Sequence, residues 1–377
     1  MSAPRLDEAR LKREVWPRFS RVLERPEIYL ANHSLGRPPD RAAQDLRGAI
    51  DAWYRDMDRA WPLWLQGRDR FRELTAKLVN ASSSDCIVPK TSAGQGLRAV
   101  LNALPGKPRV LTTDGEFDSL DFILRVYREQ GRIELKVLSF DNFRFEPCDL
   151  AVVSTVAFRT GQVLPCVEEL VRAAHRSNAM VLLDVYHHAG VLPLDLAALD
   201  ADFAVGGSYK YLRGGPGACW LYVHPRHHGL RTLDTGWFAK RDVFSYERPE
   251  PPQFAPGGDA WLESTPPVFA PFQALAGLEL TLELGVERIR EYGLVQKALL
   301  ESLLPVKGAG ENFGAFVTVV NRDAGRIASE LEEHGIRTDA RGEYLRICPD
   351  YLNAQAEIER AARQIRSMLE APAAKRA

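Results

Sequence analysis

Between about residue 85 and residue 224 the chain alternates short apolar segments with helical patterns, and this alternation constrains the fold most strongly. Helical spacing of apolar residues appears at 94–104, 118–130 and 166–177. The candidate strands are CIVPK, RVLTT, IELKVLSF, DLAVVSTVAF, AMVLLDVY, DFAVGGS and ACWLYVH. Because these segments are short and almost wholly apolar, they are typical of parallel strands covered by helices on both faces. We therefore predict an α/β fold around a mostly parallel seven-stranded sheet.

The regions on either side of this alternation predict further helices and a smaller domain. A charged helix is expected in the first 25 residues, followed by helical patterns over 41–60 and 70–80 and a long helical stretch over 268–300. The strand FVTVVN, a helix at 324–335, the strand EYLRICP and a helix at 355–370 then follow, and the tail APAAKRA is expected to be frayed. We predict an N-terminal segment at 1–40, a large domain at 41–270 and a small α+β domain at 271–377.

Composition excludes several classes of partner. The 377 residues include 49 Lys and Arg and 50 Asp and Glu, so the formal net charge is −1. This balance gives no electrostatic reason to expect nucleic acid or an anionic membrane as partner. No apolar run approaches the ~20 residues that span a bilayer, and the N-terminus lacks the apolar core of a signal peptide. We expect a cytoplasmic protein.

The cysteines indicate a reducing compartment and no metal centre. There are five of them, at scattered positions and without a CxxC pair, which is typical of reduced thiols that pack as small apolar residues. The five are Cys86, Cys148, Cys166, Cys219 and Cys348. We therefore predict no metal site.

Asp184 and Lys210 are the two charged residues that most need an explanation. Asp184 ends an apolar strand, where an unpaired carboxylate is unfavourable, and Lys210 follows the next strand and the small residues 206–208. Burial would lower the pKa of the Lys210 amine and make it a usable nucleophile. An Asp that pairs with a pyridinium nitrogen and a Lys that forms a Schiff base are what pyridoxal 5'-phosphate (PLP) requires. Taken singly, each residue is equally compatible with a structural Asp and an exposed loop Lys.

Several segments carry one resemblance, in the same order along the chain. Asp184, His187 and GSYKYLRGGPG (207–217) resemble the cofactor segment of kynureninase, a member of the class V aminotransferase group of fold-type-I PLP-dependent enzymes. The likeness extends through IYLANHSLG (28–36), FRTGQVLP (158–165), TGWF (235–238), ESTPPV (263–268) and YLRICPDYLN (344–353). The resemblance implies the PLP-dependent transferase fold, with PLP bound by the large domain and the segment 1–40 packed near the small domain and the active site.

The resemblance implies a role for each residue around the PLP ring. Lys210 would hold PLP as a Schiff base, and Asp184 would keep the pyridine nitrogen protonated. His187 would lie close to the phenolic oxygen of the cofactor, although a packed histidine at a strand end is the alternative. Phe117 would stack on the pyridine ring, with an ordinary core Phe as its alternative, and Tyr209 would assist proton transfer.

The phosphate group of PLP needs hydrogen-bond donors. KTSAGQG (90–96) leads into a helical pattern and would direct backbone N–H groups at an anion, although any helix start rich in Ser and Gly looks similar. The resemblance places Thr91 and Ser92 at the phosphate, together with Ser208 and Tyr209. Thr265 would complete the phosphate site from the neighbouring subunit, so a homodimer is expected.

Substrate recognition is predicted around Arg346, a charged residue on an otherwise apolar strand. A guanidinium binds an α-carboxylate with two parallel hydrogen bonds. The alternative is an edge-strand Arg that extends to solvent. By resemblance, Trp237 would contact the cofactor and give an aromatic substrate a flat wall, while Asn32 and Ser34 would lie near the mouth of the site.

The chain departs from the kynureninase pattern mainly around the substrate. His33 replaces the Asn of the family's Gly-Asn-Ser-Leu-Gly turn, and Lys240 replaces a His that often follows the GWF element. Leu120 stands where an Asp is expected, with Asp121 one place on, and residues 56–66 show no counterpart of the His-bearing loop that recognises the aryl ring. These changes leave the substrate open.

The function implied by the resemblance is hydrolytic Cβ–Cγ cleavage of L-kynurenine or 3-hydroxykynurenine, with anthranilate and L-alanine as the products of L-kynurenine. A class V aminotransferase or lyase that acts on another amino acid is the alternative. A cysteine desulfurase is disfavoured, because the thiol near Arg346 is Cys348, which follows it on an apolar strand. A PLP-fold protein that binds a small molecule without catalysis is disfavoured by the presence of both Asp184 and Lys210.

Overall fold

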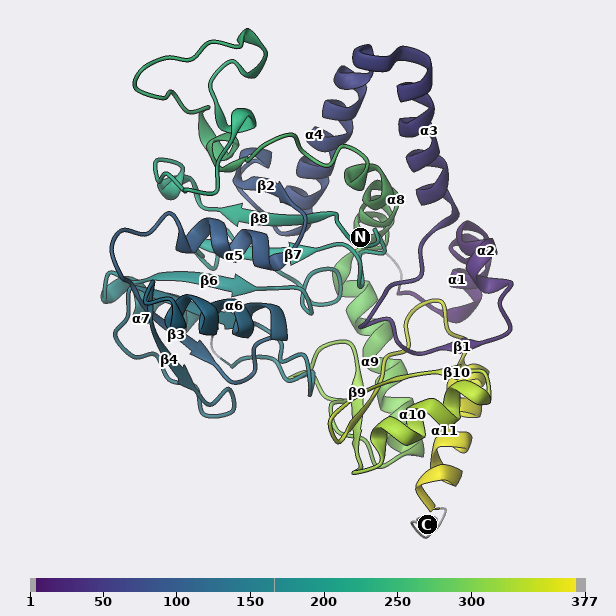
Figure 1. Ribbon diagram of the computed structural model, residues 1–377. Coiled ribbons are helices and arrows are strands. Elements are labelled where there is room, and N and C mark those ends of the chain that lie inside the picture. The colour runs from purple at the N-terminus through teal and green to yellow at the C-terminus, as the bar shows by residue number, and fades with distance from the viewer. Residues whose placement is uncertain (1–4, 166, 371–377) are drawn as a thin grey trace, which may run out of the picture.

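The computed structural model describes residues 5–165 and 167–370 (Figure 1). The first four residues of the expected N-terminal helix, Cys166 and the tail 371–377 therefore lie outside the described residues. None of the described helices is both long and apolar enough to cross a membrane. The other four cysteines are free and buried, as expected.

A seven-stranded sheet forms the centre of the molecule, and its seven strands are the seven predicted from the sequence. Its order is β2-β8-β7-β6-β5-β3-β4, and β8 runs antiparallel to both of its neighbours. The strands are β2 (Ile87–Lys90), β3 (Arg109–Thr113), β4 (Glu134–Leu138), β5 (Leu150–Ser154), β6 (Met180–Asp184), β7 (Phe203–Gly207) and β8 (Cys219–Val223). Every residue of β5, β7 and β8 is buried, which explains the continuous apolar runs in the sequence.

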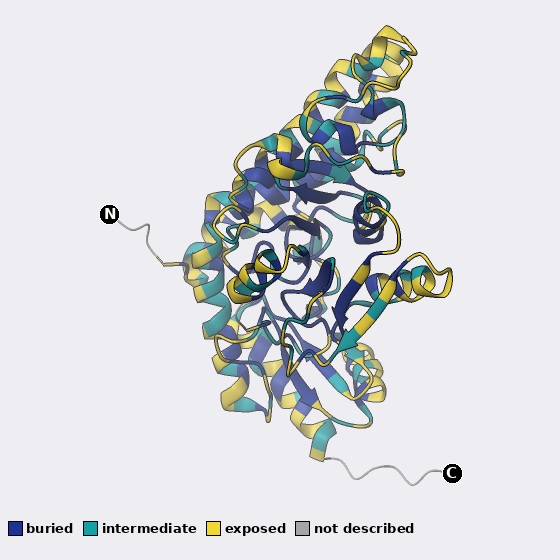
Figure 2. Cartoon of the chain, turned by 90° about the vertical axis from the view of Figure 1, so that its left-hand side faces the viewer, coloured by how far each residue is buried: buried dark blue, intermediate teal, exposed yellow. Residues whose placement is uncertain are grey.

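Helices cover both faces of this sheet (Figures 1 and 2). On one face, α4 (Trp61–Leu78), α7 (Val167–Arg176) and α8 (Ala270–Leu284) pack against alternate strand residues such as Val153. On the other face, α5 (Ala93–Leu101) and α6 (Asp118–Glu129) pack against the intervening residues, such as Val152. Adjacent residues of one strand thus enter two different cores, because side chains alternate across a sheet.

Three helix predictions need correction. The expected N-terminal helix consists of α1 (Glu8–Glu14), a 3₁₀ turn with a proline in its first turn and α2 (Ser20–Leu23). The pattern at 41–60 corresponds to α3 (Asp40–Asp56), while α4 begins at Trp61, well before the predicted start, because Pro62 in its first turn is compatible with a helix start. The stretch 268–300 is divided into α8 and α9 (Val286–Leu303) at Gly285, whose φ of 81° favours glycine.

The C-terminal part forms a separate three-stranded sheet, and the N-terminal segment pairs with it through a further two-stranded sheet. β9 (Val317–Val320), β11 (Asp339–Arg341) and β12 (Tyr344–Ile347) are antiparallel, with β12 in the middle. α10 (Ala324–Glu333) and α11 (Gln355–Glu370) pack with them around one core. β1 (Ile28–Tyr29) pairs in parallel with β10 (Ile336–Arg337), so the N-terminal segment contacts the C-terminal part of the chain here. The exact domain boundaries stay a prediction.

Candidate active site

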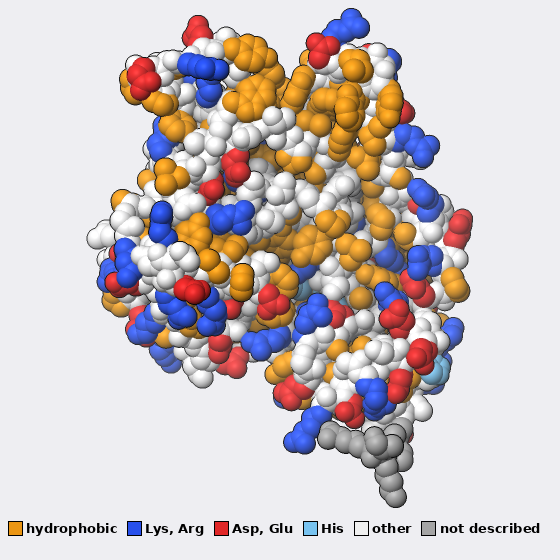
Figure 3. Space-filling view, in the orientation of Figure 1, with side chains coloured by type: hydrophobic (Ala, Val, Ile, Leu, Met, Phe, Trp, Pro, Cys, Tyr) orange, Lys and Arg blue, Asp and Glu red, His pale blue; other side chains and the backbone are white. Residues whose placement is uncertain are grey.

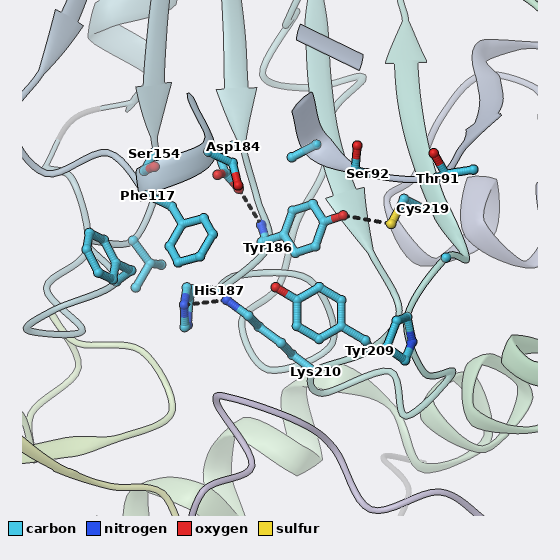
Figure 4. A pocket seen from close by; sticks show the side chains of 16 residues that line it. Thr91, Ser92, Phe117, Ser154, Asp184, Tyr186, His187, Tyr209, Lys210 and Cys219 are labelled. Carbon is cyan, nitrogen blue, oxygen red and sulfur yellow. Dashed lines mark hydrogen bonds between the residues drawn. The ribbon is translucent and has the colours of Figure 1, made fainter. Parts of the chain in front are cut away.

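A pocket opens where the parallel strands of the large sheet end (Figure 4). Ser154 and Asp184 are the last residues of β5 and β6, and Lys210 follows β7. Carboxyl ends of parallel strands are the usual place for a ligand in open α/β sheets. Of the residues predicted for the site, those that line the pocket are Thr91, Ser92, Phe117, Asp184, His187, Tyr209 and Lys210. The cavity has about 620 Å³ of empty space, part of which is open to solvent.

Asp184 presents a carboxylate that is only partly satisfied. It is buried, and among the described residues one hydrogen bond reaches its side chain, from the backbone N–H of Tyr186 to Oδ1 at 2.9 Å. Burial raises its pKa to about 6, while that hydrogen bond and the charge of Lys210 act in the opposite direction. The carboxylate can therefore accept a further hydrogen bond from a group in the pocket.

Lys210 lies across the pocket from Asp184 in a mainly aromatic environment (Figure 4). Its Nζ is 2.7 Å from Nε2 of His187 and lies 5.4 Å, 5.7 Å and 5.5 Å from the ring centroids of Phe117, Tyr186 and Tyr209. Burial lowers its pKa to about 7, against the opposing effect of the Asp184 charge. Near neutral pH a substantial fraction is thus the neutral amine, which is the nucleophilic form.

His187 is held neutral between Lys210 and a tyrosine. Burial and then the Lys210 charge lower its pKa well below the ordinary value. When the ammonium donates to Nε2, Nδ1 carries the hydrogen and donates to the hydroxyl of Tyr211 at 3.3 Å. His187 is both packed at a strand end and part of the pocket wall, so the two predicted alternatives are not exclusive.

The start of α5 lies at the far side of the pocket from Lys210 and offers an anion site (Figure 4). Ser92 caps this helix by accepting a hydrogen bond from the backbone N–H of Gln95 at 3.1 Å. The Gln95 side chain accepts hydrogen bonds from the Thr91 backbone at 2.7 Å and the Thr91 hydroxyl at 3.1 Å. The first N–H groups of a helix lack intrahelical partners, and together with the positive end of the helix dipole they favour an anion.

Two other residues predicted for the cofactor differ in their placement. Tyr209 lines the pocket, and burial raises its pKa to about 12, so its phenol stays protonated. Ser208 is buried beside the pocket, but its hydroxyl donates to the backbone carbonyl of Ala218 at 2.7 Å. In this structure Ser208 therefore stabilises the loop that carries Lys210.

Trp237 and Thr265 contact each other but do not line this pocket. Nε1 of Trp237 donates to the Thr265 hydroxyl at 3.0 Å. Trp237 belongs to an aromatic cluster with Phe238, Phe244 and Trp61. Figure 3 shows hydrophobic side chains on both sides of the hollow between this loop and the α3–α4 hairpin. Within one chain, these residues are not brought together with Lys210.

Arg346, Asn32 and Ser34, three of the predicted substrate residues, form a cluster beside the pocket, in which Arg346 and Asn32 are buried and Ser34 is half-buried. Nη1 of Arg346 donates to the Phe158 carbonyl at 2.6 Å, and Nη2 pairs with Asp339. The Ser34 hydroxyl donates to the same Asp339 carboxylate at 2.6 Å, and Asn32 donates to the backbone carbonyl of Cys348 at 2.9 Å. Arg346 is 3% exposed on the central strand β12, so the alternative of an edge-strand Arg that reaches solvent is wrong.

Among the residues that sequence reasoning missed are Tyr186, which lines the pocket, and Glu116, which binds the pocket residue Ser154. Tyr186 lines the pocket and its hydroxyl lies 2.8 Å from Sγ of Cys219. Gly207 makes room for it, because a Cβ there would lie 2.4 Å from that hydroxyl. Glu116 is buried and accepts hydrogen bonds from Thr113 and Ser154, and burial raises its pKa to about 7. The aromatic residue at a strand end was a visible signal for Tyr186, whereas nothing in the sequence marked Glu116 as buried.

Comparison with known proteins places this geometry in a family. The model of the aminotransferase class-V family matches residues 65–338, which is well over half of the chain. The chain belongs to this family. Kynureninase from Shouchella clausii is 27% identical over 359 residues, covering 85% of this chain and 82% of that protein. Kynureninase from Deinococcus radiodurans is 27% identical over 343 residues, covering 83% and 82%.

Solved structures confirm the fold-type-I architecture. A variant of C-DES, with glycine covalently linked to its PLP cofactor, has a TM-score of 0.84 at 20% identity and covers 93% of this chain and 98% of its own. A cysteine desulfurase from Thermococcus onnurineus NA1 has a TM-score of 0.78 at 18% identity and covers 98% and 100%. The predicted fold and the kynureninase-like resemblance are thus confirmed, and the family indicates PLP as the cofactor of an enzyme that acts on amino acids.

Proposed function

We propose that the protein catalyses hydrolytic Cβ–Cγ cleavage of L-kynurenine or 3-hydroxykynurenine, and that L-kynurenine yields anthranilate and L-alanine. The observation that carries this proposal is the pocket in which Lys210 and Asp184 face each other, in a chain whose similarity to kynureninases spans most of its length. The broader statement, a PLP-dependent enzyme of amino-acid chemistry, rests on the family itself.

The residues of the pocket fit PLP. Asp184 has room for one more hydrogen bond, and Lys210 has an amine close to neutrality at the other side. Between them and the start of α5 lies the cavity lined by Phe117 and Tyr209. When bound, PLP supplies an electron sink for the negative charge that develops at Cα of the substrate. Thr91 and Ser92 would bind its phosphate, and His187 would lie beside its phenolic oxygen.

The proton transfers fall to residues already in place. Asp184 would hold a proton at the pyridine nitrogen. The amine of Lys210 would remove the proton from Cα, because burial leaves it basic and neutral near pH 7. Tyr209 remains a phenol and would donate a proton on the leaving-group side. The aromatic walls exclude bulk water, so the water that adds to the γ-carbonyl carbon enters through the open side of the pocket.

Substrate binding would use the Arg346 cluster. Arg346 would bind the α-carboxylate after sharing or exchanging its pairing with Asp339, while Asn32 and Ser34 would lie at the mouth. We propose that Trp237 and Thr265 act in a homodimer, where they would face the cofactor pocket of the partner subunit. This arrangement would explain why the two residues contact each other but lie outside the pocket of their own chain.

A class V aminotransferase or lyase for another amino acid is the second candidate. The departures from the kynureninase pattern, such as Lys240 and Leu120, favour it, because they lie around the substrate while the residues predicted for PLP are present. A persulfide-forming desulfurase has no support at Cys348, which is buried and whose pKa burial raises. A binding protein without catalysis would not need a lysine of lowered pKa opposite Asp184.

Anthranilate fluorescence after mixing PLP-loaded protein with L-kynurenine tests the proposal. Lys210→Ala is the blank, and Lys307→Ala, which removes an exposed lysine, is the control for substitution itself. Release that depends on Lys210 and persists in the control is expected. No release from protein that visibly holds PLP would overturn the kynurenine proposal and favour the second candidate.

A further inference from the structure

Lys297 on α9 is a buried lysine that the chemistry above does not use. It is 1% exposed, and its ammonium points into a turn between α9 and β9. Four backbone carbonyl oxygens surround Nζ. They belong to Gly308 at 3.0 Å, Gly310 at 3.3 Å, Phe313 at 3.3 Å and Gly314 at 2.8 Å. We call residues 308–314 the carbonyl loop.

The environment of Lys297 is that of a bound monovalent cation. Its hydrogen-bond partners among the described residues are all neutral carbonyls. An ammonium has three hydrogens, so four oxygens share them. Arg290, also on α9, donates to the carbonyls of Glu311 at 2.8 Å and Gly314 at 3.0 Å. Two cations of one helix thus hold the carbonyl loop through its backbone.

The carbonyl loop in turn contacts the large domain at the segment 158–163. The backbone N–H of Gly314 donates to the carbonyl of Gly161 at 2.6 Å, and the N–H of Val163 donates to the carbonyl of Asn312 at 2.9 Å. Phe313 forms a β-bridge with Gln162 between these two bonds. The positions of the two segments are therefore coupled by backbone hydrogen bonds.

Both segments carry residues that surround the candidate active site. Phe158, at the start of one, packs edge-on against Phe117 with a centroid distance of 5.3 Å and accepts a hydrogen bond from Arg346. Phe316, two residues after the carbonyl loop, packs against His187 at 5.8 Å and beneath the Arg346 guanidinium at 5.6 Å. A shift of either segment would move Arg346 relative to the pocket.

We propose that Lys297 is a positioning residue whose ammonium occupies a cation site built from carbonyl oxygens, fixing the carbonyl loop against segment 158–163 and thereby placing Arg346 and Phe316 for amino-acid binding. This inference rests on the proposed function only in assuming that the pocket binds an amino acid. It predicts that a small free cation can replace the side chain when Lys297 is shortened, since Lys297 itself lines a neighbouring cavity between α9 and Tyr211.

The test is cation rescue of Lys297→Ala in the PLP-loaded protein. Affinities for PLP and L-alanine are measured from the absorbance of the bound cofactor, in ammonium chloride and in choline chloride at equal ionic strength, since choline is too bulky for the site. Lys307→Ala is the matched control, because Lys307 is exposed and precedes the carbonyl loop directly. If Lys297→Ala does not fold, Lys297→Ser, which also leaves the position of the ammonium empty, takes its place.

In choline, we expect alanine affinity of the variant to fall by at least about tenfold while PLP affinity changes by less than about twofold, because misplacement at a distance affects orientation first. Ammonium should restore alanine binding, and wild type and Lys307→Ala should not respond. Unchanged alanine affinity, or an equal loss in both salts, would overturn the inference. Absence of anthranilate release with normal alanine binding would instead contradict the proposed kynurenine activity.

Where wild type shows no absorbance response to alanine, the melting temperature gives the same comparison. Lys297→Ala should melt at a lower temperature in choline than in ammonium, whereas wild type should melt equally in both. Equal melting temperatures of the variant in the two salts would overturn the inference.

Discussion

Lys210 and Lys297 are both buried and both have a pKa lowered to about 7 by burial, yet their surroundings differ completely. Among the described residues the amine of Lys210 has one hydrogen-bond partner, His187, and otherwise faces aromatic rings at the edge of a cavity. Lys297 is surrounded by carbonyl oxygens. The comparison teaches that a lowered pKa alone does not mark a reactive lysine. The set of partners decides whether the amine is available for chemistry or committed to structure.

The largest effect is expected from substitution of Asp184, which lies across the pocket from Lys210. Asp184→Asn keeps the shape but cannot hold a proton at the pyridine nitrogen, so kcat should fall by about 10²–10⁴-fold. Asp45→Asn, which removes an ion pair with Arg41 on α3, is the control and should leave kcat unchanged. Steady-state kinetics with the substrate that proves active measures both. Near-normal turnover of Asp184→Asn would show that the Lys210 pocket is not the reactive one.

Substitution by methionine should change the free energy of unfolding in opposite directions at Lys210 and at Lys297. Lys210→Met removes a poorly solvated amine and should stabilise the PLP-free protein. Lys297→Met leaves buried carbonyls unpartnered, which costs about 1–3 kcal/mol for each group that stays unsatisfied. Urea unfolding of both variants beside wild type measures the difference. Equal changes of the same sign in the free energy of unfolding would contradict the distinction between Lys210 and Lys297.

The smallest expected effect is the pH dependence of the difference in free energy of unfolding between Lys210→Met and wild type. The folded-state pKa of Lys210, about 7, lies below the ordinary 10.5, so above pH 7 the unfolded chain binds more protons and the wild type gains stability as pH rises. The stabilisation by Lys210→Met should therefore be greatest at or below pH 7 and shrink by up to about 1.4 kcal/mol per pH unit above it. Unfolding at about pH 6, 7 and 8, which spans about one unit on each side of that pKa, checks this. A stabilisation by Lys210→Met that grows as pH rises would contradict this expectation.

The sequence predicted the surroundings of Lys210 better than those of Lys297. Asp184 and Lys210 stood at the ends of apolar strands, where sheet topology brings such residues to one edge. Lys297 gave no signal, because its partners are backbone carbonyls of a turn and any residue type supplies those. Asp339 likewise escaped notice, since its pairing with Arg346 depends on the register of β11 and β12.

The fold was likewise predictable in some parts and not in others. Burial on both faces made each of the seven strands visible as an apolar run, so the large sheet was predictable. The break at Gly285 between α8 and α9 was missed because apolar periodicity continues across it. Trp237 and Thr265 show the remaining limit, because the structure of one chain leaves them outside the pocket and their proposed role in a partner subunit stays a prediction.

The most direct test of the account is to locate the lysine that binds PLP. Borohydride reduction of the PLP-loaded protein, followed by peptide mass mapping, compares three buried lysines whose pKa is lowered, namely Lys90, Lys210 and Lys297. The account predicts a reduced pyridoxyl group on Lys210, absent from Lys210→Ala and retained in Lys297→Ala. A label on Lys297 or Lys90, or none on Lys210, would contradict it.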